Sequence, residues 1–397
     1  MWRAARVQGC GTRIRCVTHL RDPRLGEASI VDLFAGPGGL DVAARWMGVP
    51  TVGIEWDENA CATRRAAGLS TIQGDVRAFG PSDFSNATML AAGPPCQTYT
   101  VAGKGAGRRS LEKILAWIER LSRGDDITRS ISELDDERTG LVLEPLRWIL
   151  EAEQLGRPYE AIVLEQVPAV LPIWNAVAGV LADKGYDVQT GILRSEEFGV
   201  PQTRRRAVMI ASTRAAVVIP TATHRRYFKG RARFEGDSNL HPWRTMGETL
   251  ARQSAFIVVS NYGSGGDPKA RGRRTSDLPS ATVTGKVFRN RLLSAAGREL
   301  ARFSQDEAGQ LQTFPPDFPW RGKDIAQQIG NAIPPRLAVY VIASALDLVP
   351  AVWSLDSAAQ TSWLTASDGI VEMTGGGRPT ARAAGADIGL QQSLYRV

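Results

Sequence analysis

The chain has 397 residues, with 43% hydrophobic and 22% charged side chains, the ordinary balance of a globular protein. No apolar run approaches the roughly 18 residues of a membrane-spanning helix, and residues 1–20 lack the continuous apolar core of a secretory signal. The 4 cysteines and 3 histidines are too scattered to indicate a disulfide framework or a metal site. The composition therefore predicts a cytoplasmic protein with no membrane contact and no bound metal.

The net charge of +7 is concentrated in one part of the chain. Residues 214–274 hold 12 Lys or Arg against 4 Asp or Glu, a surplus of 8, so the remainder is nearly neutral. A basic surplus gathered in one segment is typical of contact with a phosphate backbone. The alternative interpretation is a basic surface that only faces water.

From residue 29 onward the sequence has an α/β pattern, whereas residues 1–28 are basic and irregular and are expected to be an extension. Residues 29–34 form an apolar run typical of a buried strand, residues 35–40 are rich in glycine, and residues 41–47 have helical composition. Strand, glycine turn and helix together form the unit that holds a nucleotide in a doubly wound sheet. Glycine suits this turn because it lets a ligand approach the backbone closely.

A second expected strand, residues 51–54, ends in Glu55 and is followed directly by Trp56. An acid at about this distance from the first strand commonly accepts the ribose hydroxyls of a bound nucleoside. The Trp56 indole could stack on a base or belong to the core. A third expected strand, residues 70–73, precedes Asp75, which could accept a hydrogen bond from an adenine amino group. Because the glycine stretch lacks the dinucleotide spacing, the pattern favours a mononucleoside cofactor.

A fourth expected strand, residues 87–92, leads through a rigid Gly-Pro-Pro turn to Cys96. Ligands bind beyond the carboxyl ends of strands in open α/β sheets, so Cys96 is a candidate nucleophile. The alternative is a small buried cysteine of the core. A fifth expected strand, residues 159–164, ends in Glu165, whose carboxylate would face the same crevice.

Residues 186–193 and 206–211 are expected to close the sheet as an antiparallel pair. Between them Gln202, Arg204 and Arg206 alternate, and alternating residues of a strand face one side. Arginines in that position can hold a carboxylate or a base carbonyl with two donors. The alternative is a solvated basic turn.

The pattern changes after residue 212, where the sequence is basic and bears many glycines. It is strand-like at residues 256–259 and 281–284, helical at residues 298–312, and ends in an apolar helix at residues 337–348. The expected organisation is an N-terminal extension (1–28), a main α/β domain (29–212), a smaller domain (213–325), a helix returning to the main domain (326–350) and a flexible tail (351–397).

Six stretches, in chain order, resemble the motifs of the DNA (cytosine-5)-methyltransferase family. They are residues 32–39 (DLFAGPGG), 55–57 (EWD), 93–97 (GPPCQ), 138–141 (RTGL), 202–206 (QTRRR) and 330–335 (GNAIPP). The ordered set spans most of residues 29–348 and is far more specific than any one motif. There are two departures: Gln166 follows Glu165 where the family usually has Asn, and Tyr99-Thr100 replaces the usual Phe-Ser.

The resemblance implies a Rossmann-like, S-adenosylmethionine-dependent methyltransferase sheet with a smaller, strand- and loop-rich target-recognition domain. It implies methyl transfer to C5 of a cytosine flipped out of duplex DNA, through a covalent bond from the catalytic thiol to C6. The catalytic residues would be Cys96, Glu165, Arg204 and Arg206. The cofactor would contact Phe34, Ala35, Gly36, Gly38, Gly39, Leu40, Glu55, Trp56, Asp75, Val76, Pro94, Asn331 and Ala332. Expected contacts with DNA are Gln97, Gln202, Arg225, Arg226, Arg273 and Arg274.

Other functions stay open on the sequence. A tRNA cytosine-5 methyltransferase would share Cys96 and Glu165, although the long basic segment favours duplex DNA. A catalytically inactive DNA-binding regulator is disfavoured by the intact motifs, and a nicotinamide-dependent oxidoreductase by the missing dinucleotide spacing. The expected partners are double-stranded DNA and a restriction endonuclease encoded nearby, and the expected form is a monomer associated with the nucleoid.

Overall fold

A seven-stranded sheet forms the centre of the computed structural model, which describes residues 29–95, 111–127, 137–263 and 271–377. The strand order is β3-β2-β1-β4-β5-β7-β6. The strands are β1 (Ile30–Leu33), β2 (Thr51–Glu55), β3 (Thr71–Gln73), β4 (Met89–Ala92), β5 (Ala161–Gln166), β6 (Asp187–Arg194) and β7 (Arg205–Ser212). β1 to β5 run parallel, and β7 pairs antiparallel with β5 and β6. The predicted α/β fold is confirmed.

The strand order reverses between β1 and β4, so the turns that follow these two strands lie side by side. Leu33 pairs with Ala92 in parallel register, and the chain leaves both strands at the same edge of the sheet. Such a reversal is the usual ligand site of an open α/β sheet. The fold therefore places the glycine turn (residues 34–39) beside the Gly-Pro-Pro turn, whereas Cys96 and Gln97 lie outside the described residues.

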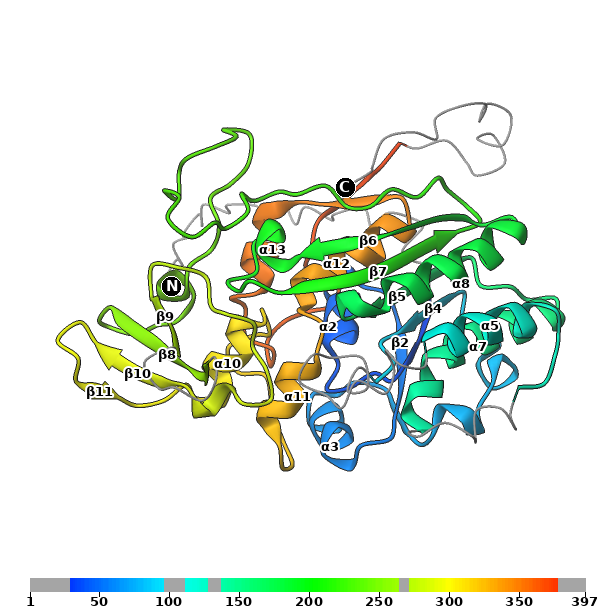
Figure 1. Ribbon diagram of the computed structural model, residues 1–397, viewed down its shortest axis with the longest axis horizontal. Coiled ribbons are helices and arrows are strands. Elements are labelled where there is room, and N and C mark those ends of the chain that lie inside the picture. The colour runs from blue at the N-terminus through cyan, green and yellow to red at the C-terminus, as the bar shows by residue number, and fades with distance from the viewer. Residues whose placement is uncertain (1–28, 96–110, 128–136, 264–270, 378–397) are drawn as a thin grey trace, which may run out of the picture.

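Helices cover both faces of this sheet (Figure 1). They are α2 (Gly39–Met47), α3 (Glu58–Ala66), α5 (Leu111–Ser122), α7 (Glu144–Gln154), α8 (Leu171–Asp183) and α12 (Pro335–Ala345). Successive side chains of a strand point to opposite faces, and the buried strand residues divide accordingly. Ile30 and Val163 pack in one core with α2 and α12, whereas Val31 and Ile162 pack with α5, α7 and α8 in another. None of the described helices is long and apolar enough to cross a membrane.

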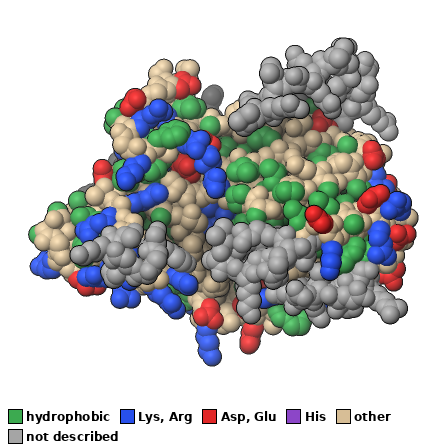
Figure 2. All heavy atoms as spheres, in the orientation of Figure 1, with side chains coloured by type: hydrophobic (Ala, Val, Ile, Leu, Met, Phe, Trp, Pro, Cys, Tyr) green, Lys and Arg blue, Asp and Glu red, His purple; other side chains and the backbone are tan. Residues whose placement is uncertain are grey.

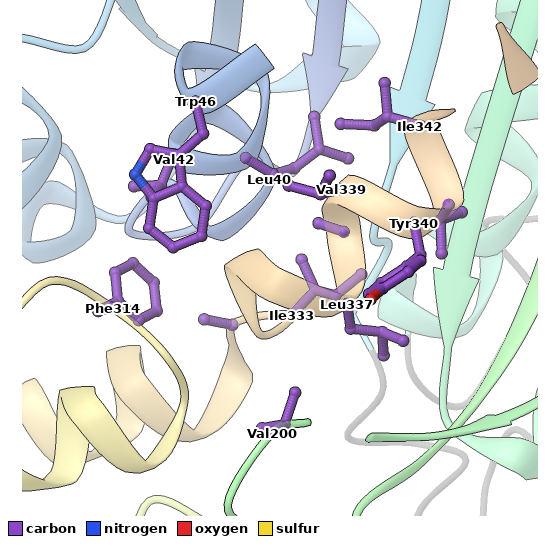
Figure 3. Close-up of a cluster of buried hydrophobic side chains, with 14 of the residues drawn as sticks. Leu40, Val42, Trp46, Val200, Phe314, Ile333, Leu337, Val339, Tyr340 and Ile342 are labelled. Atoms are coloured by element: carbon purple, nitrogen blue, oxygen red, sulfur yellow. The ribbon is translucent and has the colours of Figure 1, made fainter. Parts of the chain in front are cut away.

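The return helix α12 is the centre of the first core, because every residue along it is buried. Figure 3 shows Leu337 and Val339 of α12 gathered with Leu40 and Trp46 of α2. The same cluster continues into the smaller domain through residues such as Phe256. The two domains therefore share one continuous core.

The smaller domain is built on a four-stranded antiparallel sheet in the order β11-β10-β8-β9. Its elements are β8 (Phe256–Gly263), β9 (Arg271–Thr275), β10 (Arg291–Ser294), β11 (Glu299–Leu300), α9 (Met246–Thr249), α10 (Gln305–Leu311) and α11 (Ile325–Asn331). The prediction of a helix over residues 298–312 is wrong at its start, because Ser304 caps α10 and accepts from the Glu307 N–H. Residues 281–284 form no strand.

The segment after residue 350 also differs from the predicted flexible tail, because residues 351–377 pack on the body. They contain α13 (Val352–Ala358) and β13 (Met373–Gly375), which pairs with β12 (Leu348–Pro350). Trp363 is buried, and its indole N–H donates to the Ala67 carbonyl at 3.1 Å. Trp363 thus anchors a stretch whose composition is typical of a loop. Residues 1–28 and 378–397 lie outside the described part of the chain.

Candidate active site

The glycine turn has a backbone that side chains would disrupt. Gly36 and Gly38 adopt φ of 56° and 105°, in the left-handed region that favours glycine. Gly39 starts α2 so close to the return motif that an added Cβ would lie 2.3 Å from the Ile333 carbonyl oxygen. The predicted residues of the 330–335 motif thus lie against the turn, and they fix the first turn of α2.

Glu55, at the end of β2, is tied to the same turn. Its carboxylate accepts the N–H groups of Gly36 and Asp57, each at 2.7 Å. Burial raises the pKa of Glu55. The next side chain, Trp56, is 72% exposed and so does not belong to the core. A half-buried carboxylate beside an open backbone turn and an exposed indole face fits the ribose and base of a nucleoside.

The remaining predicted cofactor residues lie around this edge with partners of their own. Asp75 follows β3 and caps a short helix, and the Arg77 guanidinium at 2.6 Å holds the pKa of Asp75 below its usual value. Val76 is buried. Asn331 ends α11, and its side-chain oxygen accepts from Gln327 Nε2 at 2.6 Å.

A buried charge cluster beneath the glycine turn was not predicted from the sequence. It consists of Asp32, Asp41 and Arg64, whose side chains are almost completely buried. Arg64 donates from two nitrogens to the Asp41 carboxylate, at 2.6 and 2.9 Å. Burial, and then the neighbouring Asp41 carboxylate, raise the pKa of Asp32 well above its usual value. Gly53, a glycine inside the strand β2, is the sequence feature connected with this cluster. Any side chain there would clash with Arg64, because an added Cβ would lie 2.0 Å from its guanidinium.

The second half of the edge is formed by β4 and β5. Glu165, near the end of β5, is buried and forms an ion pair with Arg206 of β7, with Oε1 and Nε 2.5 Å apart. The other oxygen of Glu165 faces Gly93, where an added Cβ would lie 3.7 Å away. The carboxylate is therefore held at the turn that leads into Cys96.

Gln166, the departure from the family pattern, braces that turn. Its amide nitrogen donates to the Pro94 carbonyl, and its amide oxygen accepts the Val167 N–H at 2.5 Å. Both ends of the longer side chain are therefore satisfied. Gln166 joins the end of β5 to the turn after β4, beside the Glu165 carboxylate that precedes it.

Gln202 and Arg204 lie elsewhere than the sequence pattern suggested. They precede the start of β7, so strand alternation does not apply to them, and both are buried. Gln202 donates to the Leu311 carbonyl and accepts the Val283 N–H. Arg204 donates to the carbonyls of Val283, Gly330 and Ala332 at 2.9 to 3.1 Å. These two side chains join the domains, whereas Arg206 alone contacts Glu165.

Comparison with known proteins identifies this architecture. Residues 28–122 and 127–232, half of the chain, match the family described as C-5 cytosine-specific DNA methylase. The chain belongs to this family. Type II methyltransferase M1.HphI of Haemophilus parahaemolyticus is 28% identical over 360 residues, covering 80% of this chain and 86% of the relative. M.NgoFVII of Neisseria gonorrhoeae is 24% identical over 362 residues, covering 81% and 87%.

Solved structures agree with the fold of the methylase. The Dnmt2 methyltransferase of S. pombe superposes with a TM-score of 0.52 at 17% identity, over 80% of this chain and 98% of that chain. The Entamoeba histolytica methyltransferase EhMeth gives a TM-score of 0.51 at 13% identity, over 81% and 98%. The family match makes the protein a DNA cytosine-5 methyltransferase that depends on S-adenosylmethionine, and the residues around the glycine turn fit that cofactor.

The arginines predicted to contact DNA in this methylase divide into two groups. Arg273, on the edge strand β9, is exposed, and so is Arg226. Arg274 instead donates to the carbonyls of Pro279 and Ser280 at 2.8 and 2.9 Å, and burial lowers its pKa. Arg225 is half-buried and donates to the Asp237 carbonyl at 2.8 Å. Arg225 and Arg274 are thus hydrogen-bonded within the protein, whereas Arg226 and Arg273 are exposed.

Proposed function

We propose that the methylase modifies one specific sequence of duplex DNA through a covalent bond between Cys96 and C6 of the target cytosine. The observation that carries this proposal is the Glu165–Arg206 ion pair, held against the turn that leads into Cys96. That position is next to the glycine turn, where the methyl donor fits. A nucleophile, an acid and the methyl donor would then meet at one edge of the sheet.

The chemistry follows from the reactivity of cytosine. Its C5 is a poor nucleophile, but addition of a thiolate to C6 makes an enamine whose C5 can attack a methyl group. Glu165 would hydrogen-bond or protonate N3, which stabilises the electrons displaced from the C5–C6 double bond. Arg206 would hold the Glu165 carboxylate and face the base carbonyl. A water molecule then takes the C5 proton, the C5–H electrons restore the C5–C6 double bond, and the C6–S bond breaks to release the thiolate.

S-adenosylmethionine supplies the methyl group on its sulfonium. The residues of this chain would bind and orient it: the Glu55 carboxylate for the ribose, the Trp56 face and Asp75 for the adenine, and the backbone of the glycine turn for the rest. The target base must leave the stack to reach this edge, because stacking hides C6. The exposed Arg273 would contact DNA from the smaller domain.

The covalent step is tested with duplex DNA that carries 5-fluorocytosine at the target. Fluorine cannot leave C5 as a proton does, so the enzyme should stay bound after methyl transfer in a species that survives denaturation. The variant Cys96→Ser should form no such species, because a serine hydroxyl is a far weaker nucleophile than a thiolate. Glu165→Gln should slow both trapping and turnover, by roughly 100-fold or more.

Cofactor affinity should stay near normal in both variants, which separates a chemical defect from a binding defect. An adduct mapped to Cys10, Cys16 or Cys61 would refute the role of Cys96. Absence of trapping by the wild-type protein on a verified target would favour an inactive regulator. Methyl transfer to tRNA in place of duplex DNA would support the RNA-modifying alternative.

We also propose that the protein is the modification enzyme of a restriction–modification pair, acts as a monomer and associates with the nucleoid. The support is the type II class of the relatives M1.HphI and M.NgoFVII. DNA methylated by this protein should resist an endonuclease encoded beside its gene. Cleavage of fully methylated DNA by that endonuclease would contradict the pairing, and sedimentation of the protein with and without DNA tests the monomer.

A further inference from the structure

A basic finger (residues 225–240) projects from the chain between β7 and α9. Its two ends are joined by a bridge between His224 and His241, in which the Arg225 N–H donates to the His241 carbonyl at 2.7 Å. The His241 N–H donates to the Thr223 carbonyl at 3.0 Å. Figure 1 shows this green segment, after β7, standing away from the β8–β11 sheet. The finger is therefore a closed excursion, distinct from the sheet of the smaller domain.

The base of the finger is firmly attached to the body. His224 is buried, and the Thr223 hydroxyl lies 3.3 Å from the Tyr340 hydroxyl of α12. Tyr227 packs edge-on against the buried ring of Trp243, with centroids 5.5 Å apart. Because its base is fixed on α12 and on the core, the finger can hold its outer side chains in a defined place.

The outer part of the finger combines cations with exposed aromatic rings. The whole finger, residues 225–240, has five Lys or Arg against two acidic residues. The guanidinium carbons of Arg226 and Arg231 lie 4.6 and 4.9 Å from the centre of the Phe228 ring. Phe234 is 73% exposed, with the Arg233 guanidinium over its ring. Figure 2 shows Lys and Arg side chains gathered over this side of the molecule.

Two guanidinium groups that converge on one ring repel each other unless an anion lies near them. Arg231 has a carboxylate partner, Glu235. Because Arg231 Nε and Glu235 Oε1 are 3.7 Å apart and both side chains are about half exposed, this ion pair contributes little to stability. Arg226 and Lys229 are exposed and form no ion pair within the described residues, although the Glu197 carboxylate lies close enough to Arg226 for the two charges to interact. A phosphate group supplies the missing charge, and arginines on a fixed platform bind it well.

We propose that the basic finger binds the phosphate backbone of duplex DNA outside the target sequence and without regard to base sequence. The proposal rests on the proposed action on duplex DNA, and it assigns the finger a task different from that of the β8–β11 sheet. Phosphate contacts position a protein on DNA but carry no sequence information. The finger would therefore add affinity and register, while sequence choice stays with the rest of the smaller domain.

The test compares the double variant Arg226→Ala/Lys229→Ala with the wild type on two duplexes. One covers only the target sequence, as found by sequencing methylated DNA, and the other extends it by about one helical turn (roughly 10 base pairs) on each side. On the long duplex the variant should bind roughly 10-fold more weakly, with a salt dependence smaller by about two units of slope. On the short duplex the two proteins should bind alike.

A matched control removes two cations at the opposite edge of the main sheet. Arg157 and Lys184 lie near the amino ends of β5 and β6, so Arg157→Ala/Lys184→Ala should leave binding to both duplexes unchanged. Phe228→Ala, which removes the platform, should weaken binding to the long duplex alone. Unaltered binding of S-adenosylmethionine by each variant shows that the fold is intact.

The proposal is overturned by an equal loss on both duplexes, by no loss on either, or by a changed methylated sequence. The last result would mean that the finger reads bases. The first two outcomes are measured by binding and do not depend on turnover, whereas the third is read by sequencing DNA that the variant has methylated. If the wild-type protein methylates no duplex DNA, the proposed function itself fails, whatever the finger variants do.

Discussion

The buried charge cluster beneath the glycine turn and the basic finger both gather charged side chains, but in opposite settings. In the cluster, Arg64 and Asp41 are fully buried and share two hydrogen bonds. On the finger, Arg226 is exposed and no carboxylate in the described residues forms an ion pair with it. Buried charge must be compensated inside the protein, and so it fixes the backbone around it. Exposed charge that no carboxylate holds in an ion pair is available to a partner.

The largest expected effect is at the buried charge cluster. Asp41→Ala would leave the Arg64 guanidinium buried without its carboxylate, which should lower the free energy of unfolding by roughly 3–5 kcal/mol. Asp32→Asn should change it by less than about 1 kcal/mol, because burial and the Asp41 carboxylate both disfavour a charge on Asp32, and a neutral amide can donate to Asp41. Urea denaturation of the two variants measures the difference. Equal losses would show that Asp32 is charged in the folded protein.

The next largest effect is expected at Glu55, whose carboxylate lies at the same edge of the sheet but is proposed to bind the cofactor and not to stabilise the fold. Glu55→Ala should lower the affinity for S-adenosylmethionine by roughly 1.5–3 kcal/mol, because the ribose loses a charged hydrogen-bond acceptor. Glu58→Ala, which removes an exposed acid three residues later, is the control and should bind normally. Calorimetry measures both. Normal binding by Glu55→Ala would mean that the cofactor site lies elsewhere.

The base of the finger offers a test by pH. Burial, and then the charge of Arg336, lower the pKa of His224 to about 3. Its unfolded pKa is near 6.5, so as pH falls below that value the unfolded chain takes up a proton that the folded chain refuses. The free energy of unfolding should then fall by about 1.4 kcal/mol per pH unit, or roughly 2 kcal/mol at about pH 5.

His241, Arg244 and Asp356 also act on His224, but their combined effect does not reverse the direction. His224→Asn removes the titrating group and should flatten the pH dependence in urea denaturation, even where it lowers stability at all pH values. An unchanged slope in the variant would show that another group titrates.

The smallest effect separates two neighbouring arginines of β9. Arg274→Ala should destabilise the smaller domain by roughly 1–2 kcal/mol, because two carbonyls and the Tyr227 ring lose a partner. Arg273→Ala should leave stability unchanged but reduce the salt dependence of DNA binding by about one unit of slope. Thermal denaturation measures the stability of both variants, and DNA binding at several salt concentrations measures the salt dependence of each. A stability loss in Arg273→Ala together with a smaller salt dependence in Arg274→Ala would show that Arg273 is the structural residue and Arg274 the DNA contact.

Much of the cofactor edge could be predicted because its signals are local. Buried apolar runs predicted all seven strands of the main sheet to within two residues at each end, and the same runs placed Glu55 and Glu165 at strand ends. Gln202 and Arg204 were placed incorrectly because alternation holds only within a strand, and β7 begins at Arg205. Their partners lie between 79 and 128 residues further along the chain, and local pattern carries no information about them.

The smaller domain and the last segment were predicted less well for related reasons. The capping pair Ser304 and Glu307 was present in the sequence and could have placed the start of α10. Residues 351–377 have a loop-like composition, and their order depends on Trp363, which no periodic pattern accompanies. Arg64 likewise looks like an ordinary surface residue of a helix until α2 and β2 are packed around it.

The contact between α2 and the last described segment affects when the cofactor pocket can form. Arg45 of α2 donates to Asp368 across 323 residues of sequence, and its guanidinium lies 4.2 Å from the centre of the Trp363 ring. Chains fold from the N-terminus as they are synthesised, and contacts this distant form late. The first strand, turn and helix of the pocket are thus made early but gain their last support only when residues 363–368 have left the ribosome. A nascent chain should therefore acquire S-adenosylmethionine affinity abruptly, once residues 363–368 have emerged.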